Sequence, residues 1–238
     1  MEILFVHGAL VRDGAWWWQQ VAELVQRETG VASRAVALPS CGEGAAPGGA
    51  GLVEDAAALG AALDHTDGGA LVVGHSYGGT VIAEGADHPA ARHLLLVSSY
   101  LPDIGSSQGA IMSGEQDPVA VADRGDGTIG VAGYDEETFG ARFWADVDDP
   151  AIRAGAWARL TPQSAAAFGT PTTAAAWRDR PSTYLVCTDD RSTSVALQRE
   201  HAARATRTVD LPTGHHPFLS QPDLVAAEVR TILEGTAA

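Results

Sequence analysis

Leu71-Val72-Val73-Gly74-His75-Ser76-Tyr77-Gly78-Gly79 is the stretch that decides how the rest of the chain is arranged. An apolar run leads into Gly74, a serine follows two residues later, and glycine returns at position 78. This G-x-S-x-G pattern is typical of a nucleophile elbow, a sharp strand-to-helix turn that holds a serine hydroxyl clear of the backbone. The turn strains the backbone of the serine, and the flanking glycines avoid collisions with neighbouring chain. A glycine-rich turn without chemistry is the alternative interpretation.

Composition limits both the architecture and the partners of the protein. With 238 residues, of which 45% are hydrophobic and 19% charged, the chain fits one globular domain with an insertion. The net charge of −15 argues against binding to nucleic acid, because few cations would face the phosphates. Cys41 and Cys187 lie too far apart in sequence to suggest a disulfide framework or a metal-binding spacing.

The N-terminus and the hydropathy pattern bear on location. Residues 1–6 enter an apolar strand directly, without the basic segment that opens a signal peptide. No apolar run approaches the length of a membrane span. We therefore expect a cytoplasmic protein without a membrane partner.

Strand-like and helix-like segments alternate over most of the chain. Such alternation predicts a parallel sheet of about six strands with helices on both faces. A helix beginning at Asp13 as a cap and a glycine-rich loop over residues 40–51 are part of this pattern. The segments predicted as strands are 3–6, 31–38, 70–73, 93–98, 182–187 and 206–211.

The alternation is lost between residues 103 and 180, where aromatic residues and short helical segments gather. We predict a core of residues 1–101 and 181–238, and a helical cap of residues 102–180 over the active site. A helical subdomain whose aromatics only pack is the alternative. Expected helices within the cap are 135–144, 150–160 and 162–168. The residues expected to line the substrate pocket are Leu10, Trp17, Tyr100, Met112, Phe143, Trp144, Phe168 and His216.

Three polar side chains follow predicted strands at the edge where ligands bind in parallel sheets. Ser76 needs a base to take its proton, and His215 has the right basicity, with His216 as its rival. Asp190, or its neighbour Asp189, would orient the imidazole and stabilise its charged form.

The remaining histidines and acidic residues receive other roles. His75 is excluded as the base because neighbouring side chains of a strand point to opposite sides. His7 is expected to brace the loop that follows the first strand, and His65, His88, His93 and His201 are expected at the surface or in packing. The aspartates at 146, 148 and 149 favour a solvated acidic turn over a cation site. We expect no metal and no cofactor.

Together these motifs resemble the α/β-hydrolase superfamily along nearly the whole chain. The resemblance is to the compact branch of plant methylesterases and hydroxynitrile lyases, with many bacterial esterase-like relatives. It rests on residues 7–9, 14–18, 74–79, 184–190 and 215–220. It implies an α/β-hydrolase fold with a mostly parallel sheet and a helical cap inserted after the fourth strand.

The resemblance also implies roles for single residues. The backbone N–H groups of Ala9 and Tyr77 would form the oxyanion hole. The family's acid stands a fixed step before a helical F/L-Q pair, which Leu197-Gln198 matches from Asp190. The family's H-x-P-F-L-S block begins at His215.

One departure separates this chain from the lyases. They carry a threonine after the first-loop histidine and a lysine after the catalytic histidine, where this chain has Gly8 and His216. The departure favours ester hydrolysis, and we expect His216 to contact the substrate.

We therefore predict a serine hydrolase that cleaves a small or medium, hydrophobic carboxylic ester through an acyl-enzyme. One alternative is thioester or lactone hydrolysis, or a lyase-type reaction in a biosynthetic pathway, by the same residues. Another is a ligand-binding protein that has the fold without turnover. Whether the chain forms a homodimer is left open.

Overall fold

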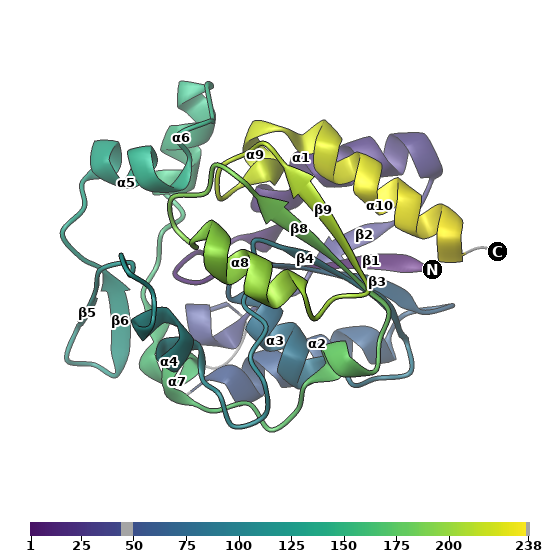
Figure 1. The fold of residues 1–238 in the computed structure, drawn as a ribbon, viewed down its shortest axis with the longest axis horizontal. Helices are drawn as coiled ribbons and strands as arrows, with labels where there is room; N and C mark the ends of the chain where they lie inside the picture. The colour runs from purple at the N-terminus through teal and green to yellow at the C-terminus, as the bar shows by residue number, and fades with distance from the viewer. Residues whose placement is uncertain (44–49, 237–238) are drawn as a thin grey trace.

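A six-stranded parallel sheet forms the centre of the computed structural model, which describes residues 1–43 and 50–236 (Figure 1). The order across the sheet is β2–β1–β3–β4–β8–β9. The chain moves from β1 outward to β2 and then returns to β3 on the other side of β1. The loops after β1 and β3 are therefore neighbours at the switch point, where parallel sheets bind ligands. The strands are β1 Glu2–Val6, β2 Ser33–Ala35, β3 Ala70–His75, β4 Ala91–Val97, β8 Ser182–Cys187 and β9 Arg207–Leu211.

The predicted fold is confirmed, but one strand is shorter than expected. The sequence predicts a strand over residues 31–38, whereas β2 spans Ser33–Ala35 and pairs only with β1. As an edge strand it has a single partner, and the chain soon turns into the short helix η1 Pro39–Cys41. Residues 44–49 of the predicted loop lie outside the described residues.

Helices cover both faces of the sheet (Figure 1). On one face Trp18 of α1 stacks on Phe5 of β1 at 4.7 Å between ring centroids, and α1 packs against the last helix, α10. The other face is covered by α2, α3 and α8. None of the helices in residues 1–43 and 50–236 is long and apolar enough to cross a membrane. The covering helices are α1 Gly14–Thr29, α2 Leu52–Asp64, α3 Gly78–Gly85, α8 Val195–Ala202, α9 Pro217–Ser220 and α10 Pro222–Thr236.

The start of α1 differs from the prediction. Asp13 was expected to cap this helix, but its side chain makes no cap hydrogen bond and its backbone is left-handed, with φ of 66°. Its carboxylate instead pairs with Nε of Arg159 at 2.9 Å. An aspartate tolerates the left-handed region better than most residues, so position 13 serves a turn and an ion pair.

The segment between β4 and β8 carries the predicted helices and also a small antiparallel sheet, β5–β6–β7, that the sequence pattern does not reveal. The helix expected over residues 162–168 begins only at Ala165, because Gln163 and Ser164 form β7 beside β6. The division of the chain at residues 102 and 180 stays a prediction. The elements are α4 Gln108–Ser113, β5 Val121–Asp123, β6 Thr128–Val131, α5 Glu136–Phe143, α6 Pro150–Trp157, β7 Gln163–Ser164, α7 Ala165–Gly169 and η2 Ala176–Arg178.

This inserted segment is joined to the loop after β1. Val11 and Leu160 form an isolated antiparallel bridge. On either side of it, Arg12 N–H donates to the Arg159 carbonyl at 3.0 Å, and Thr161 N–H donates to the Leu10 carbonyl at 2.9 Å. The first loop and the insertion therefore form one continuous seam.

Candidate active site

The nucleophile elbow has the geometry that its glycines predict. Ser76 lies between β3 and α3 with a left-handed φ of 51° and is partly exposed at the end of a buried strand. A Cβ added to Gly78 would lie 2.4 Å from the Val6 carbonyl oxygen, and one added to Gly74 would lie 3.0 Å from the backbone of Gly78. The tight turn thus presents the Ser76 hydroxyl outward. The strained backbone costs about 1–3 kcal/mol, which the packing of the surrounding fold offsets.

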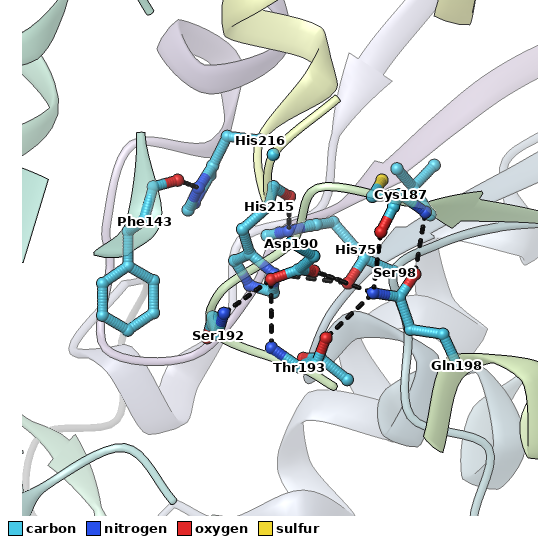
Figure 2. Close-up of polar contacts among 12 residues, drawn as sticks. His75, Ser98, Phe143, Cys187, Asp190, Ser192, Thr193, Gln198, His215 and His216 are labelled. Atoms are coloured by element: carbon cyan, nitrogen blue, oxygen red, sulfur yellow. Dashed lines mark hydrogen bonds and ion pairs between the residues drawn. The ribbon is translucent and has the colours of Figure 1, made fainter. Parts of the chain in front are cut away.

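The loops after β8 and β9 bring Asp190 and His215 together (Figure 2). Nδ1 of His215 lies 2.8 Å from Oδ2 of Asp190. Within the part of the chain that the structure describes, Asp189, the rival acid, makes only a backbone bond to Thr213. His216 contacts the Phe143 carbonyl instead. The residues alone left Asp189 and His216 open as alternatives. The pair in contact is Asp190 and His215, which the resemblance suggested.

Asp190 is fully buried, and its hydrogen bonds favour the charged form. Burial alone would raise the pKa of this carboxyl, but His215 and the donors around it outweigh burial and lower the pKa. The backbone N–H groups of Ser192 and Thr193 donate to Oδ1 at 2.7 and 3.1 Å. Gln198, from the predicted family pair, donates its amide to Oδ2 at 3.0 Å. The acid is therefore an anion fixed in position beside the imidazole.

Ser98, at the end of β4, completes this group and was missed by the sequence reasoning. Its hydroxyl donates to Oδ2 of Asp190 at 2.5 Å and lies 3.2 Å from Nδ1 of His215 (Figure 2). Its φ of 41° is left-handed, which a serine adopts only where its surroundings require it. A serine directly after an apolar strand, at the edge where Ser76 also lies, is the signal that could have revealed it.

The loop after β1 lies beside the elbow in a second strained turn. His7 braces it, as expected, through Nδ1 to the Gly8 carbonyl at 2.8 Å and Nε2 to Glu43 at 2.9 Å. Leu10 has a φ of 60°, rare for a leucine. Its N–H donates to Oε1 of Gln163 at 2.8 Å, so the insertion fixes this turn.

The two N–H groups predicted for the oxyanion hole are available. Among residues 1–43 and 50–236, the N–H groups of Ala9 and Tyr77 have no hydrogen-bond acceptor. Tyr77 stands at the start of α3, where backbone N–H groups lack partners within the helix. Both groups flank Ser76, which lines the same cavity as Ala9.

A buried polar network supports both loops from below, and sequence reasoning missed it as well. Oδ2 of Asp55, a fully buried carboxylate of α2, accepts from the hydroxyls of Ser40 and Tyr77 at 2.5 and 2.7 Å. Burial raises the pKa of Asp55, and these donors oppose the increase. Gln163 donates to the Ser40 hydroxyl at 2.9 Å, which links the network to Leu10.

The cavity in front of Ser76 has mostly apolar walls. Of the predicted pocket residues, Trp17 alone does not line it. This residue is fully buried behind the ring of His216, at 5.3 Å between centroids, and its Nε1 donates to the Arg12 carbonyl. The predicted residues that do line it are Leu10, Tyr100, Met112, Phe143, Trp144, Phe168 and His216.

The cavity also carries His75, which was excluded as the base. Its Nε2 is bonded to the His215 carbonyl at 2.9 Å. Burial and then the neighbouring His215 lower the pKa of His216 to about 3, and the same two causes place the pKa of His75 well below its usual range. Both rings are therefore neutral at pH 7.

The acidic turn at residues 146–149 contributes more than expected. Asp146 is half-buried and accepts a hydrogen bond from Gly214 N–H at 2.7 Å. It therefore holds the loop that carries His215, whereas Asp148 and Asp149 are exposed, as a solvated turn requires.

Comparisons with known proteins identify the family and the fold of the chain. The sequence model of the alpha/beta hydrolase family matches residues 3–228. An alpha/beta hydrolase, nvfD, from Aspergillus novofumigatus is 30% identical over 173 residues, which are 67% of this chain and 68% of that protein.

Solved structures share the fold at lower sequence identity. The pyrethroid hydrolase from Sphingobium faniae JZ-2 is 22% identical with a TM-score of 0.82, over 100% of this chain and 98% of that one. The methylesterase MES16 from Arabidopsis is 18% identical with a TM-score of 0.74, over 98% and 99% of the two chains. The expected membership of the α/β-hydrolase superfamily is confirmed, and the curated relative described above is fungal.

Proposed function

Because this chain belongs to the alpha/beta hydrolase family, we propose that it is a serine hydrolase that cleaves a small or medium, uncharged carboxylic ester with a hydrophobic acyl or alcohol group. The observation that carries the proposal is one cavity that Ser76 and His215 both line, with His215 paired to Asp190 behind it. The relatives that are named as a pyrethroid hydrolase and a methylesterase support an ester as the substrate.

In the proposed reaction Ser76 Oγ attacks the ester carbonyl while Nε2 of His215 takes the hydroxyl proton. Asp190 holds the ring by its Nδ1–H and stabilises the imidazolium. The oxyanion accepts from Ala9 and Tyr77 N–H, and each such donor lowers the barrier by about 2.7–4 kcal/mol. The imidazolium then protonates the leaving alcohol.

The second half of the cycle uses the same groups in reverse. Water enters where the alcohol left, gives a proton to Nε2 of His215 and attacks the acyl carbonyl. The tetrahedral intermediate collapses, the carbonyl–Oγ bond breaks, and the proton returns to Ser76. The products are a carboxylic acid and a regenerated enzyme.

The walls of the cavity favour a neutral substrate. Among the described residues that line it there is no aspartate, glutamate or arginine. A charged group would lose its hydration here without an oppositely charged partner, at a cost of several kcal/mol. The net charge of −15 also disfavours the approach of anions. Phosphate-bearing thioesters are therefore poorer candidates than simple esters.

A fluorophosphonate probe tests the proposed chemistry. We expect its covalent mass on Ser76, loss of labelling in Ser76→Ala, and unchanged labelling in Ser113→Ala, a matched change at an exposed serine. An unlabelled but folded wild-type protein would contradict catalysis and favour a ligand-binding role.

A substrate panel then tests the class of compound. It pairs p-nitrophenyl esters of rising acyl length with thioesters, lactones and mandelonitrile. We expect the esters to have the highest kcat/KM. A lactone or thioester with a higher kcat/KM, or release of cyanide, would replace the ester assignment.

A further inference from the structure

Three imidazole rings meet in the wall of the cavity at the proposed active site. The ring centroids of His75 and His215 are 4.5 Å apart, those of His75 and His216 are 4.7 Å apart, and those of His215 and His216 are 4.8 Å apart. All three side chains, which Figure 2 labels, are buried to more than nine-tenths, and all three line the cavity in front of Ser76. The reaction proposed above uses only one of them, His215.

One nitrogen of each ring is already bonded to an acceptor. His75 Nε2 contacts the His215 carbonyl at 2.9 Å, and His216 Nδ1 contacts the Phe143 carbonyl at 2.8 Å. His215 Nδ1 contacts Asp190 at 2.8 Å. In the form of each ring that carries a single proton, these contacts place that proton on the bonded nitrogen. In protein metal sites the outer nitrogen of a ligating histidine likewise donates to a carbonyl or carboxylate.

The opposite nitrogens are the ones left with a lone pair. Among the residues that the structure describes, Nδ1 of His75 and Nε2 of both His215 and His216 have no hydrogen-bond partner. Glycine at position 8 keeps space beside His75 Nδ1, because a Cβ added there would lie 2.9 Å from this nitrogen. The three rings can each offer one nitrogen within 4.8 Å of the other two.

We propose that His75, His215 and His216 form a binding site for a divalent transition-metal ion such as Zn²⁺, and that an ion bound there inhibits the enzyme. Three imidazoles with one open tetrahedral position are a known zinc arrangement, with Zn–N distances of about 2.0–2.1 Å. Tetrahedral ligands at that distance lie roughly 3.3 Å apart. The ligating nitrogens would therefore have to approach one another by at most about 1.5 Å when an ion binds.

The chemistry of the ligands decides which ions fit. Neutral imidazole suits Zn²⁺, Cu²⁺, Ni²⁺ and Co²⁺, whereas Mg²⁺ and Ca²⁺ prefer oxygen. The inhibition, though not the binding, rests on the proposed function. An ion on Nε2 of His215 takes the lone pair that would accept the proton of Ser76.

Metal binding is measured on the full-length protein by calorimetry with Zn²⁺ and by visible spectroscopy with Co²⁺. We expect one ion per chain, the intense visible bands of four-coordinate Co²⁺, and no binding of Mg²⁺ at the same concentration. In His216→Asn the amide can still donate to the Phe143 carbonyl while the ligand nitrogen is lost. Because changes around a metal site already cost 10–100-fold in affinity, loss of a ligand is expected to weaken Zn²⁺ binding by at least about 100-fold.

His65→Asn is the matched control, since His65 is exposed on the end of α2 and outside the cluster. It is expected to bind Zn²⁺ as the wild type does. Absence of stoichiometric binding, or equal binding by His216→Asn, would overturn the proposal.

A second measurement on the unmodified protein does not depend on the folding of a variant. Zn²⁺ is expected to slow fluorophosphonate labelling of Ser76 at least 10-fold, with full recovery after a chelator is added. Labelling at an unchanged rate with the site saturated would refute inhibition. If Ser76 is never labelled although Co²⁺ binds, the proposed function fails and the metal site stands.

Discussion

Replacing Gln163 by methionine removes two buried hydrogen bonds while nearly keeping the length of the side chain. Gln163 is fully buried, accepts from Leu10 N–H at 2.8 Å and donates to the Ser40 hydroxyl at 2.9 Å. The first bond holds a leucine in the left-handed region, directly after the Ala9 N–H proposed for the oxyanion hole. Gln163 is therefore expected to position this loop without touching the substrate.

The expected size of the effect follows from two terms. An orphaned buried N–H at Leu10 costs about 1–3 kcal/mol, and the left-handed leucine stores about 1–2 kcal/mol. If the loop relaxes, the unpaired N–H can find a new partner and the backbone strain at Leu10 is relieved. Loss of the Gln163 amide therefore favours relaxation of the loop. The movement withdraws the Ala9 N–H, and loss of one oxyanion donor is worth about 100–1000-fold in kcat.

The assay compares kcat, KM and the free energy of unfolding in urea. We expect Gln163→Met to lower kcat about 100-fold or more, to change KM less than threefold, and to destabilise the fold by about 1–3 kcal/mol. Ser40→Ala is the comparison variant. It removes the hydroxyl that contacts both Gln163 and Asp55 but leaves the Leu10 bond in place, so it is expected to lose stability with a smaller loss of kcat than Gln163→Met. A Gln163→Met enzyme with kcat within twofold of wild type, whatever its stability, would refute the reasoning.

Four further substitutions probe other parts of the structure. Ser98→Ala removes a hydrogen bond to the predicted acid and is expected to lower kcat about 10-fold with little change in KM, as checked by ester hydrolysis. Gly78→Ala places a methyl group 2.4 Å from a carbonyl oxygen of β1 and should destabilise the fold by about 1–3 kcal/mol in urea. At Gly60 an added Cβ meets none of the described atoms within 4 Å, so Gly60→Ala should stabilise the fold by about 0.5–1 kcal/mol. Burial lowers the pKa of His201 to about 4. The pKa of a histidine in the unfolded chain is about 6.5, so below this pH the unfolded chain takes up a proton that folded His201 does not. The free energy of unfolding therefore falls by up to about 1.4 kcal/mol per pH unit, and His201→Phe should remove this part of its pH dependence between pH 7 and 5.

Features with a local cause were predictable from the sequence. The elbow follows from the steric needs of Gly74 and Gly78, and the sheet follows from alternating apolar segments. The position of Asp190 and His215 after two strands places them at the same edge of a parallel sheet as Ser76, because such strands share a direction.

Other features depend on contacts between distant residues, which local patterns do not carry. Gln163 meets Leu10 across 153 positions of sequence, and His75 meets the carbonyl of His215 across 140. The strands β5–β7 are two to four residues long, too short for a periodic signal. The prediction that Trp17 lines the pocket is wrong, because the sequence pattern does not show which side of α1 faces the pocket.

The seam between residues 10–12 and 159–161 constrains how reactants can enter and leave. An inserted segment joined to the sheet domain only at its two ends could move as a rigid lid. Here one margin of the insertion, residues 159–161, is also joined to the loop after β1 by two backbone hydrogen bonds and a bridge. Lifting that margin would also dismantle the turn that presents Ala9. Substrate and product are therefore expected to pass away from that margin, so that the proposed enzyme can exchange an alcohol for water without disturbing the turn at Ala9.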